Sequence, residues 1–191
     1  MKVLLHMCCG ICAIPAVEKL LCDGYTITGF FYNPNIHPVD EYQRRLEAAR
    51  KVSGEWGFEL VEGKYDREKW FEAVRGHEYE KEGGERCLIC YRLRLEKTYE
   101  YAKRHMYDAF TTTLTSSPMK DVSAINRIGG DIGGDRFIRA DFKKNGALER
   151  ASVLSREMGL YRQGYCGCVY GHEQQMLKEE RTRGNESEKK Q

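Results

Sequence analysis

Short apolar segments alternate with longer amphipathic ones along the first part of the chain. Four runs rich in apolar or β-branched residues predict strands, at Lys2–Met7, Thr26–Tyr32, Phe58–Glu62 and Ala109–Leu114. Apolar positions with helical spacing predict helices at Ala13–Leu21, Asp40–Trp56, Glu68–Val74 and Tyr91–Arg104. Strands that alternate with helices are typical of right-handed βαβ crossovers. We therefore expect an α/β fold, with a parallel sheet and helices on both of its faces.

The pattern weakens after residue 120. Two glycine pairs, Gly129–Gly130 and Gly133–Gly134, indicate a mobile or tightly turned loop, and one more helix is predicted at Glu149–Met158. This C-terminal part should be helical or irregular. The last residues, 177–191, are charged and almost without apolar side chains, which predicts a disordered tail. We expect residues 1–176 to form a single α/β domain.

The lengths of the apolar segments bear on the cellular compartment of the protein. The N-terminal residues do not contain the long apolar core of a signal peptide, and no later run approaches the length that spans a membrane. A cytoplasmic protein is therefore expected. Because thiols stay reduced in the cytoplasm, the eight cysteines indicate metal ligands or catalytic groups rather than a disulfide framework.

Charge adds little to this picture. The chain carries 31 Lys and Arg against 29 Asp and Glu, a net charge of +2, which neither indicates nor excludes a nucleic-acid partner. Residues 127–162 contain eight basic and five acidic side chains. That modest excess fits either a solvated surface or a set of phosphate contacts.

Five cysteines lie at the beginnings of two predicted helices. Cys8, Cys9 and Cys12 follow the first predicted strand, at the edge where open parallel sheets bind their ligands. Cys87 and Cys90 form a Cys-x-x-Cys motif at or before the first turn of the helix predicted from residue 91. The positive end of a helix favours the thiolate form of a cysteine there.

The remaining cysteines differ in kind. Cys166 and Cys168 form a Cys-x-Cys motif, which is too tight for a comfortable disulfide and indicates either a labile redox pair or a metal clip. Cys22 ends the first predicted helix, where we expect it to be a small buried hydrophobe.

Seven cysteines in three groups leave several kinds of site open. A [4Fe–4S] cluster needs four thiolates. A structural zinc site also uses four, commonly as two Cys-x-x-Cys knuckles, and the adjacent Cys8 and Cys9 make a poor knuckle. Iron–sulfur, zinc and unrelated buried thiols all remain possible on spacing alone. The surplus of three thiols beyond four ligands nevertheless argues for redox or catalytic chemistry.

Longer blocks of sequence carry a resemblance to a known family. They are LLHMCCGIC, FFYNPNIHP, EGGERCLICYRLRLE, FTTTLTSSPMK, INRIGG and DFKKNGALERASVLSREMGLYRQGYCGC, in that order. Together they cover nearly the whole chain apart from its tail, and the chain thereby resembles the epoxyqueuosine reductases of the QueH type.

The resemblance implies an activity, a fold and partners. The activity is cobalamin-independent, reductive removal of the epoxide oxygen from epoxyqueuosine at the wobble position of tRNA, which yields queuosine. The fold is similar to the HUP-like adenine-nucleotide α-hydrolases. The implied partners are tRNA with epoxyqueuosine in its anticodon loop and an unidentified electron donor.

The resemblance also implies roles for most of the thiols. Four cysteines match the ligands of a [4Fe–4S] cluster: Cys8, Cys9, Cys87 and Cys90. Cys166 and Cys168 match a redox-active pair, and they are alternatively possible ligands of a second, mononuclear iron. Cys12 lies in the matched motif without an implied role.

Other polar residues are weaker candidates for contacts with the tRNA. Bases are recognised by stacking on aromatic rings and by bonds to polar side chains, while cations bind phosphates. On that basis the candidate substrate-binding residues are Tyr32, Asn33, Thr112, Ser116, Lys143, Lys144 and Arg162. Ordinary roles in turns and in the core explain most of them equally well. His6 is expected to face the packed side of the sheet.

Two other functions compete with the reductase. An ATP-using tRNA-modifying enzyme would need a phosphate loop rich in glycine and serine after the first strand, where this chain reads CCGIC. A zinc-stabilised nucleic-acid-binding module without catalysis would bind zinc and no iron.

Overall fold

A parallel sheet of four strands forms the centre of the molecule, for which the computed structural model describes residues 1–174 and residue 176. The strand order is β3–β2–β1–β4. The strands are β1 (Lys2–His6), β2 (Thr26–Phe31), β3 (Glu59–Glu62) and β4 (Ala109–Thr112). All four predicted strands and their parallel pairing are confirmed.

Strand β1 lies between β2 and β4, with His6 opposite Phe30 on one side and Thr112 on the other. Because the strands are parallel, their carboxyl ends reach the same edge of the sheet. The segment that follows each strand therefore starts at that edge. His6 is fully buried there, as predicted, and its ring nitrogens bond to Thr112 Oγ1 and to the carbonyl of Tyr32.

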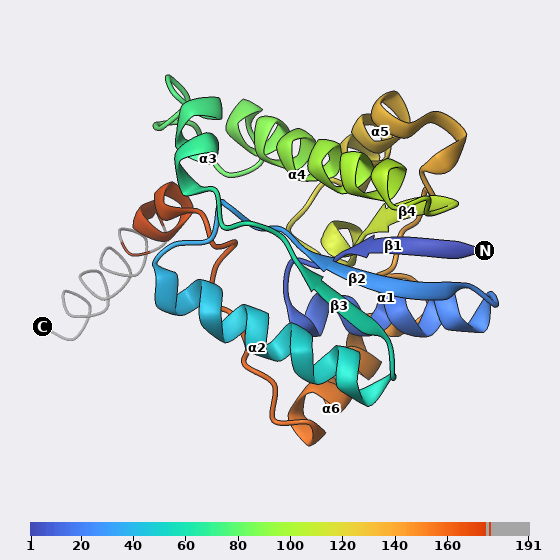
Figure 1. Ribbon diagram of the computed structural model, residues 1–191. Coiled ribbons are helices and arrows are strands. Elements are labelled where there is room, and N and C mark those ends of the chain that lie inside the picture. Colours follow the sequence, from blue (N-terminus) through green and yellow to red (C-terminus); the bar gives the residue numbers. More distant parts are fainter. Residues whose placement is uncertain (175, 177–191) are drawn as a thin grey trace, which may run out of the picture.

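Helices cover both faces of the sheet, as predicted (Figure 1). Helices α4 and α5 lie on one face, and α1, α2 and α6 on the other. The helices are α1 (Gly10–Cys22), α2 (Val39–Glu55), α3 (Arg67–Ala73), α4 (Glu85–Arg104), α5 (Val122–Gly133) and α6 (Ala147–Glu157). The short α3 packs beside α4.

Each face has its own hydrophobic core. Adjacent residues of a strand point to opposite faces, and accordingly Leu4 packs with Leu95 and Phe110 while Leu5 packs with Ile14. All five of these residues are completely buried. This two-sided burial explains why β1 reads as an unbroken apolar run.

Helix α5 corrects the loop that the glycine pairs predicted. The carboxylate of Asp121 caps the helix by accepting the backbone N–H groups of Ser123 at 2.8 Å and Ala124 at 3.1 Å. A side chain on Gly129 would collide with the ring of Phe137. The glycine therefore serves close packing in this helix, and the packing outweighs its low helix propensity.

Two further predictions about the cysteines were wrong. Helix α4 begins at Glu85 rather than at Tyr91, so Cys87 and Cys90 lie inside its first two turns and not before them. Cys22 is exposed at the end of α1 and is not a buried hydrophobe. The remaining predicted helices are confirmed with small shifts at their ends.

Some predictions concern the end of the chain. The proposed tail, residues 177–191, lies outside the described residues, so the domain boundary stays a prediction. Among residues 1–174 and 176, no helix has both the length and the apolar content that a bilayer crossing requires.

Candidate thiol and metal centre

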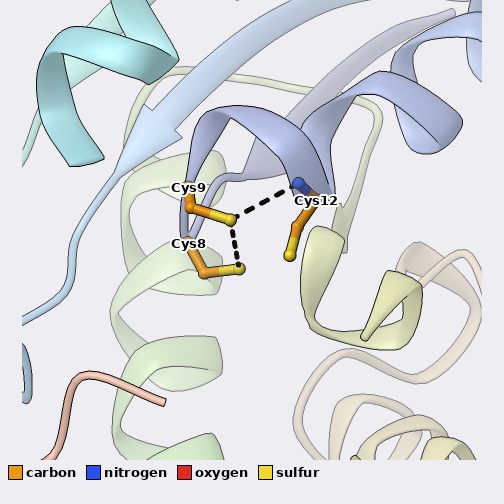
Figure 2. Close-up of side chains that lie close together, drawn as sticks. All are labelled: Cys8, Cys9 and Cys12. Atoms are coloured by element: carbon orange, nitrogen blue, oxygen red, sulfur yellow. Dashed lines mark hydrogen bonds between the residues drawn. The ribbon is translucent and has the colours of Figure 1, made fainter. Parts of the chain in front are cut away.

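The first thiol group lies where β1 passes into α1. The sulfurs of Cys8, Cys9 and Cys12 all lie within 4.8 Å of one another, and Figure 2 shows them gathered at the start of the helix. Cys9 is the residue that caps α1, and its Sγ accepts the backbone N–H of Cys12 at 3.4 Å. We call these three residues the triad.

A close helix contact fixes the position of the triad. A Cβ atom on Gly10 would lie 2.6 Å from the carbonyl oxygen of Ala48 in α2. Only glycine therefore lets the first turn of α1 approach α2 this closely. The CCG sequence thus combines two thiols with the residue that seats them against the neighbouring helix.

Polar neighbours donate hydrogen bonds to the triad. The hydroxyl of Thr113, which follows β4, donates to Cys8 Sγ at 3.3 Å and accepts the Cys8 backbone N–H at 3.0 Å. The side-chain amide of Gln163 donates to Cys9 Sγ at 3.0 Å and to Cys12 Sγ at 3.7 Å. Such donors stabilise negative charge on sulfur.

The three cysteines of the triad differ in the pKa of their thiols. Hydrogen bonds from Cys12 and Cys9 lower the pKa of Cys8 well below that of an ordinary thiol. The same contacts with Cys8 and Cys9 raise the pKa of Cys12. A hydrogen bond from Cys12 lowers the pKa of Cys9, but its contact with Cys8 and its burial outweigh that effect and raise the value to about 12. One thiolate, at Cys8, is therefore favoured in the triad.

The second thiol group joins segments far apart in the sequence. Cys87 and Cys90 of α4 and Cys166 and Cys168 of the C-terminal loop line one small cavity of about 20 Å³. We call these four residues the thiol quartet. All four are free thiols, and Cys90 and Cys168 are buried.

Three buried polar atoms around this small cavity have no hydrogen-bond partner in the described part of the chain. They are Asn35 Oδ1, Trp70 Nε1 and Arg86 Nε, and their residues all line the cavity. Buried polar groups are normally paired, so two unpaired donors and one unpaired acceptor beside four sulfurs indicate a place for a polar or ionic group. The quartet therefore fits a metal–thiolate group as well as a dithiol.

The thiols of the quartet also differ in pKa. A hydrogen bond from Cys168 lowers the pKa of Cys166 to about 6, and the reciprocal contact raises the pKa of Cys168. Cys166 is therefore the favoured thiolate of the Cys-x-Cys pair. Burial raises the pKa of Cys87, against the prediction that the helix end would favour its thiolate.

The C-terminal loop is held by a buried arginine of α2. Arg45, only 3% exposed, donates to the carbonyl oxygens of Cys166 at 3.0 Å and Tyr165 at 2.8 Å. Its charge is balanced by the buried Glu41, at 2.6 Å, and that carboxylate also accepts the hydroxyl of Tyr161 at 2.5 Å. The loop bearing Cys166 is thus attached to the helix framework by an ion pair.

A large cavity of about 640 Å³ adjoins the small one. Its lining includes Cys8 and Cys12 of the triad, and it shares four residues with the small cavity: Glu82, Arg94, Lys120 and Cys166. All three predicted cysteine groups therefore face two adjoining cavities at the carboxyl edge of the sheet. Arg45, which reads as a surface position of an amphipathic helix, was missed in the sequence, as was Arg94.

The predicted substrate-binding residues lie in different settings. Ser116 and Arg162 line the large cavity. Tyr32, Asn33 and Thr112 are buried, where Asn33 Nδ2 donates to the Met7 carbonyl and Thr112 bonds to His6. Lys143 and Lys144 lie in the turn that precedes α6 and are not among the residues lining either cavity.

The donor set narrows the chemistry of the centre. Thiolates are soft ligands that select iron–sulfur clusters, zinc or copper. Seven thiols face the two cavities or lie beside Cys8, more than the four that one structural metal site uses. The arrangement is therefore suited to a metal–thiolate centre with further thiols beside it.

Comparison with known sequences identifies relatives over most of the chain. The family model described as "Epoxyqueuosine reductase QueH" matches residues 3–174. A protein named epoxyqueuosine reductase QueH from Haemophilus influenzae is 39% identical over 173 residues, which cover 88% of this chain and 71% of the relative. Its namesake from Thermotoga maritima is 38% identical over 174 residues, covering 88% of each chain.

Solved structures share the fold at low sequence identity. A predicted subunit of tRNA methyltransferase from Methanocaldococcus jannaschii is 17% identical, with a TM-score of 0.51, over 80% of this chain and 76% of that one. The U34-tRNA thiolase NcsA from Methanococcus maripaludis with its [4Fe–4S] cluster is 15% identical, with a TM-score of 0.51, over 86% and 58%. These likenesses confirm the predicted fold class.

Proposed function

The chain belongs to the epoxyqueuosine reductase QueH family, and on that premise we propose that it reduces epoxyqueuosine in tRNA to queuosine. One observation of the structure carries the proposal: the triad and the quartet face adjoining cavities at one edge of the sheet. A substrate in the large cavity would therefore meet thiols of both groups. Such a reaction takes place where tRNA is modified, in the cytoplasm.

The reaction needs two electrons and two protons. Cleavage of both C–O bonds of the epoxide leaves an alkene, and the oxygen departs as water. Oxidation of the Cys166 thiolate and the Cys168 thiol to a disulfide would release two electrons and one proton, and solvent would supply the second proton, which balances the equation. An external electron donor must then reduce the disulfide before the next turnover.

The properties of the Cys-x-Cys pair support this role. Cys166 has a pKa lowered to about 6, mainly by its hydrogen bond from Cys168, so it is a thiolate at neutral pH. Its sulfur also accepts the backbone N–H of Cys168 at 3.4 Å. A thiolate beside a protonated thiol is the arrangement from which a disulfide forms. Ligation of a second, mononuclear iron by this pair is the alternative.

We propose that Cys8, Cys9, Cys87 and Cys90 hold a [4Fe–4S] cluster. Such a cluster supplies single electrons at a potential that the surrounding protein sets. Support comes from the soft thiolate donors and from the 4.0 Å separation of the Cys8 and Cys9 sulfurs. The two cavities that the thiol groups line also share four residues. Cys12 is then an additional thiol beside the cluster, with a raised pKa because it bonds to Cys8 and Cys9.

The large cavity would take the modified nucleotide. Its volume of about 640 Å³ lies within the usual ~300–1,000 Å³ of small-molecule sites. Enzymes that act on a base extrude it from its stack into such a pocket. Ser116 and Arg162 line this cavity, so the geometry supports these two among the predicted substrate contacts. Lys143 and Lys144 would bind phosphates outside this cavity.

A zinc-stabilised nucleic-acid-binding module is the second candidate. One observation favours it, since four cysteines line a cavity of about 20 Å³, which has room for a single ion. Metal content separates the two functions directly.

The decisive experiment compares the wild-type protein with Cys168→Ser and Cys22→Ser, all purified under argon. We expect wild-type protein to be brown, with about four iron and four sulfide per chain, and to convert epoxide-bearing tRNA into queuosine-bearing tRNA. Cys168→Ser should lose turnover and keep the cluster absorption, while the exposed Cys22 can be replaced without effect. Colourless protein that contains only zinc would favour the binding module. Loss of the cluster in Cys168→Ser would make Cys168 a ligand and refute the division of roles.

A further inference from the structure

Helix α4 carries a buried cation that the proposed function does not use. Arg94 is only 3% exposed, and it lines both the small and the large cavity. Its Nε donates to the carbonyl of Cys90 in the preceding turn at 3.0 Å, and its guanidinium lies 5.6 Å from the centre of the Tyr91 ring. Neither contact brings a negative charge to it.

No carboxylate of the described residues pairs with Arg94, since none of their ion pairs includes it. Glu82 lines the same cavities, but it is exposed and forms no ion pair with Arg94. A buried charge without a counter-charge strongly destabilises a folded protein. Arg94 should therefore face an anion in the working enzyme.

The two other buried arginines of the described residues have hydrogen-bond partners at their Nη atoms, although Arg86 Nε has none. Arg45 forms an ion pair with Glu41. Arg86, 1% exposed, donates from Nη1 to the carbonyl oxygens of His77 and Glu78. In the described part of the chain, neither Nη atom of Arg94 has a carboxylate or a carbonyl partner.

Cysteines of both thiol groups line the same cavities as Arg94, Cys90 and Cys166 the small one and Cys8 the large one. Burial lowers the pKa of Arg94, but the negative charges of Cys90 and Cys8 outweigh burial and raise it. Cys166 contributes in the same direction. Arg94 thus lines a cavity with cysteines of each group, and the charge of each group raises its pKa.

We propose that Arg94 is the buried counter-charge of the thiolate–metal centre and sets its reduction potential. The inference rests on the proposed function, because it requires a redox centre held by these thiols. Reduction adds negative charge to the centre, and a nearby cation stabilises the more negative form. Arg94 therefore raises the midpoint potential and makes the centre easier to reduce.

A phosphate of the tRNA is the competing anion. The slight exposure of Arg94 favours the internal sulfurs over an RNA backbone, which binds cations at the surface. Lys120 also lines both cavities, but it is only half-buried, so water screens its charge more strongly.

The test uses the anaerobically purified full-length holoenzyme. Two neutral variants, Arg94→Met and Arg94→Gln, differ in polarity, so a packing defect in one leaves the other informative. Arg94→Lys restores the charge, and Arg92→Met removes an exposed arginine of the same helix as the control. Each variant is measured for iron and sulfide content, midpoint potential by spectroelectrochemical titration, and affinity for the tRNA.

We expect every variant to retain iron and sulfide. Both neutral variants should have a more negative midpoint potential than wild type, Arg94→Lys should recover most of the shift, and Arg92→Met should show none. Neutral variants with the wild-type potential would overturn the inference. An unchanged potential with weaker tRNA binding would assign Arg94 to a phosphate instead. Wild-type protein without a redox-active metal would refute the proposed function itself, a result that the metal analysis separates from the others.

Discussion

The two thiol groups differ in how the chain assembles them. Cys8 and Cys9 directly precede α1 and Cys12 lies in its first turn, so their sulfurs are brought together by local backbone geometry at the end of β1. The quartet instead combines α4 with a loop more than seventy residues further along the chain, from Cys90 to Cys166. The first group is therefore a local feature and the second depends on tertiary contacts.

Because of this difference, the arrangement of the quartet is more sensitive to mutation than that of the triad. The loop of Cys166 and Cys168 is attached to the framework through Arg45 and its counter-charge Glu41. The triad needs no comparable attachment, because β1 is buried in the centre of the sheet. A change that loosens the loop should disturb the quartet and leave the triad in place.

The largest expected effect comes from removing the favoured thiolate of the triad. Cys8→Ser should lower the turnover of epoxide-bearing tRNA by at least ~100-fold, since loss of even an outer-shell partner costs a metal site about 10- to 100-fold. It should also lower the iron content, because hydrogen bonds from Cys12 and Cys9 depress the pKa of Cys8 and prepare it as a ligand. Iron analysis and turnover measure both effects.

The matched control is Cys22→Ser at the far end of α1. Cys22 is an exposed free thiol, so its replacement should change neither quantity. Full iron content in Cys8→Ser would show that the triad does not hold the metal and would reverse the roles of the two groups.

The same contrast between local and distant contacts explains what the sequence could predict. The four strands, the face-covering helices and the convergence of cysteines at one edge follow from local patterns, and the structure confirms the strands and helices. Helix α5 was missed because its glycines pack against Phe137 and Phe110, contacts that lie outside any sequence window. The early start of α4 at Glu85 was missed for lack of an apolar periodic pattern in its first turn.

Part of the site was equally hidden. Arg45 and Arg94 occupy positions of amphipathic helices that composition assigns to the surface. Arg45 pairs with Glu41 and bonds to the cysteine loop, while Arg94 lines a cavity with Cys166, and the fold alone brings the loop near both. Sequence patterns therefore locate reactive residue types, while their charge partners depend on the three-dimensional packing.

Breaking the ion pair under the loop should have the next largest effect. Glu41→Gln leaves the buried Arg45 without its counter-charge, and loss of one partner of a buried pair costs ~3–5 kcal/mol of stability. Burial raises the pKa of Glu41, but the hydrogen bond from Tyr161 and the charge of Arg45 outweigh burial and lower it. Urea unfolding at several pH values measures the loss.

The direction of the pKa shift sets the pH dependence. A carboxyl with a lowered pKa in the folded state stabilises the protein above its unfolded pKa of about 4.3 and loses that contribution as the pH falls through the folded value. The wild type should therefore exceed Glu41→Gln most at neutral pH and lose its advantage below about pH 4. The exposed Glu47 of the same helix is the control, and Glu47→Gln should cost less than ~1 kcal/mol. Equal losses at both positions would contradict the role of the buried pair.

The smallest effect isolates the contact between the loop and Arg45. Gly167 has a φ of +102°, and a Cβ there would lie 2.9 Å from Arg45 Nη1 and 3.0 Å from Ile36 Cγ1. Gly167→Ala should lower the free energy of unfolding by ~1–3 kcal/mol, measured in urea, from backbone strain plus displacement of an arginine held at several points.

Gly24→Ala is the matched control, because Gly24 also has a positive φ, of +79°, but a Cβ there meets nothing within 4 Å. The excess cost at Gly167 measures the contacts with Arg45 and Ile36. It should be accompanied by slower turnover at unchanged iron content, since the change moves the Cys-x-Cys pair and leaves the triad seated. Equal costs for both alanine variants would mean that Arg45 yields freely and does not position the loop.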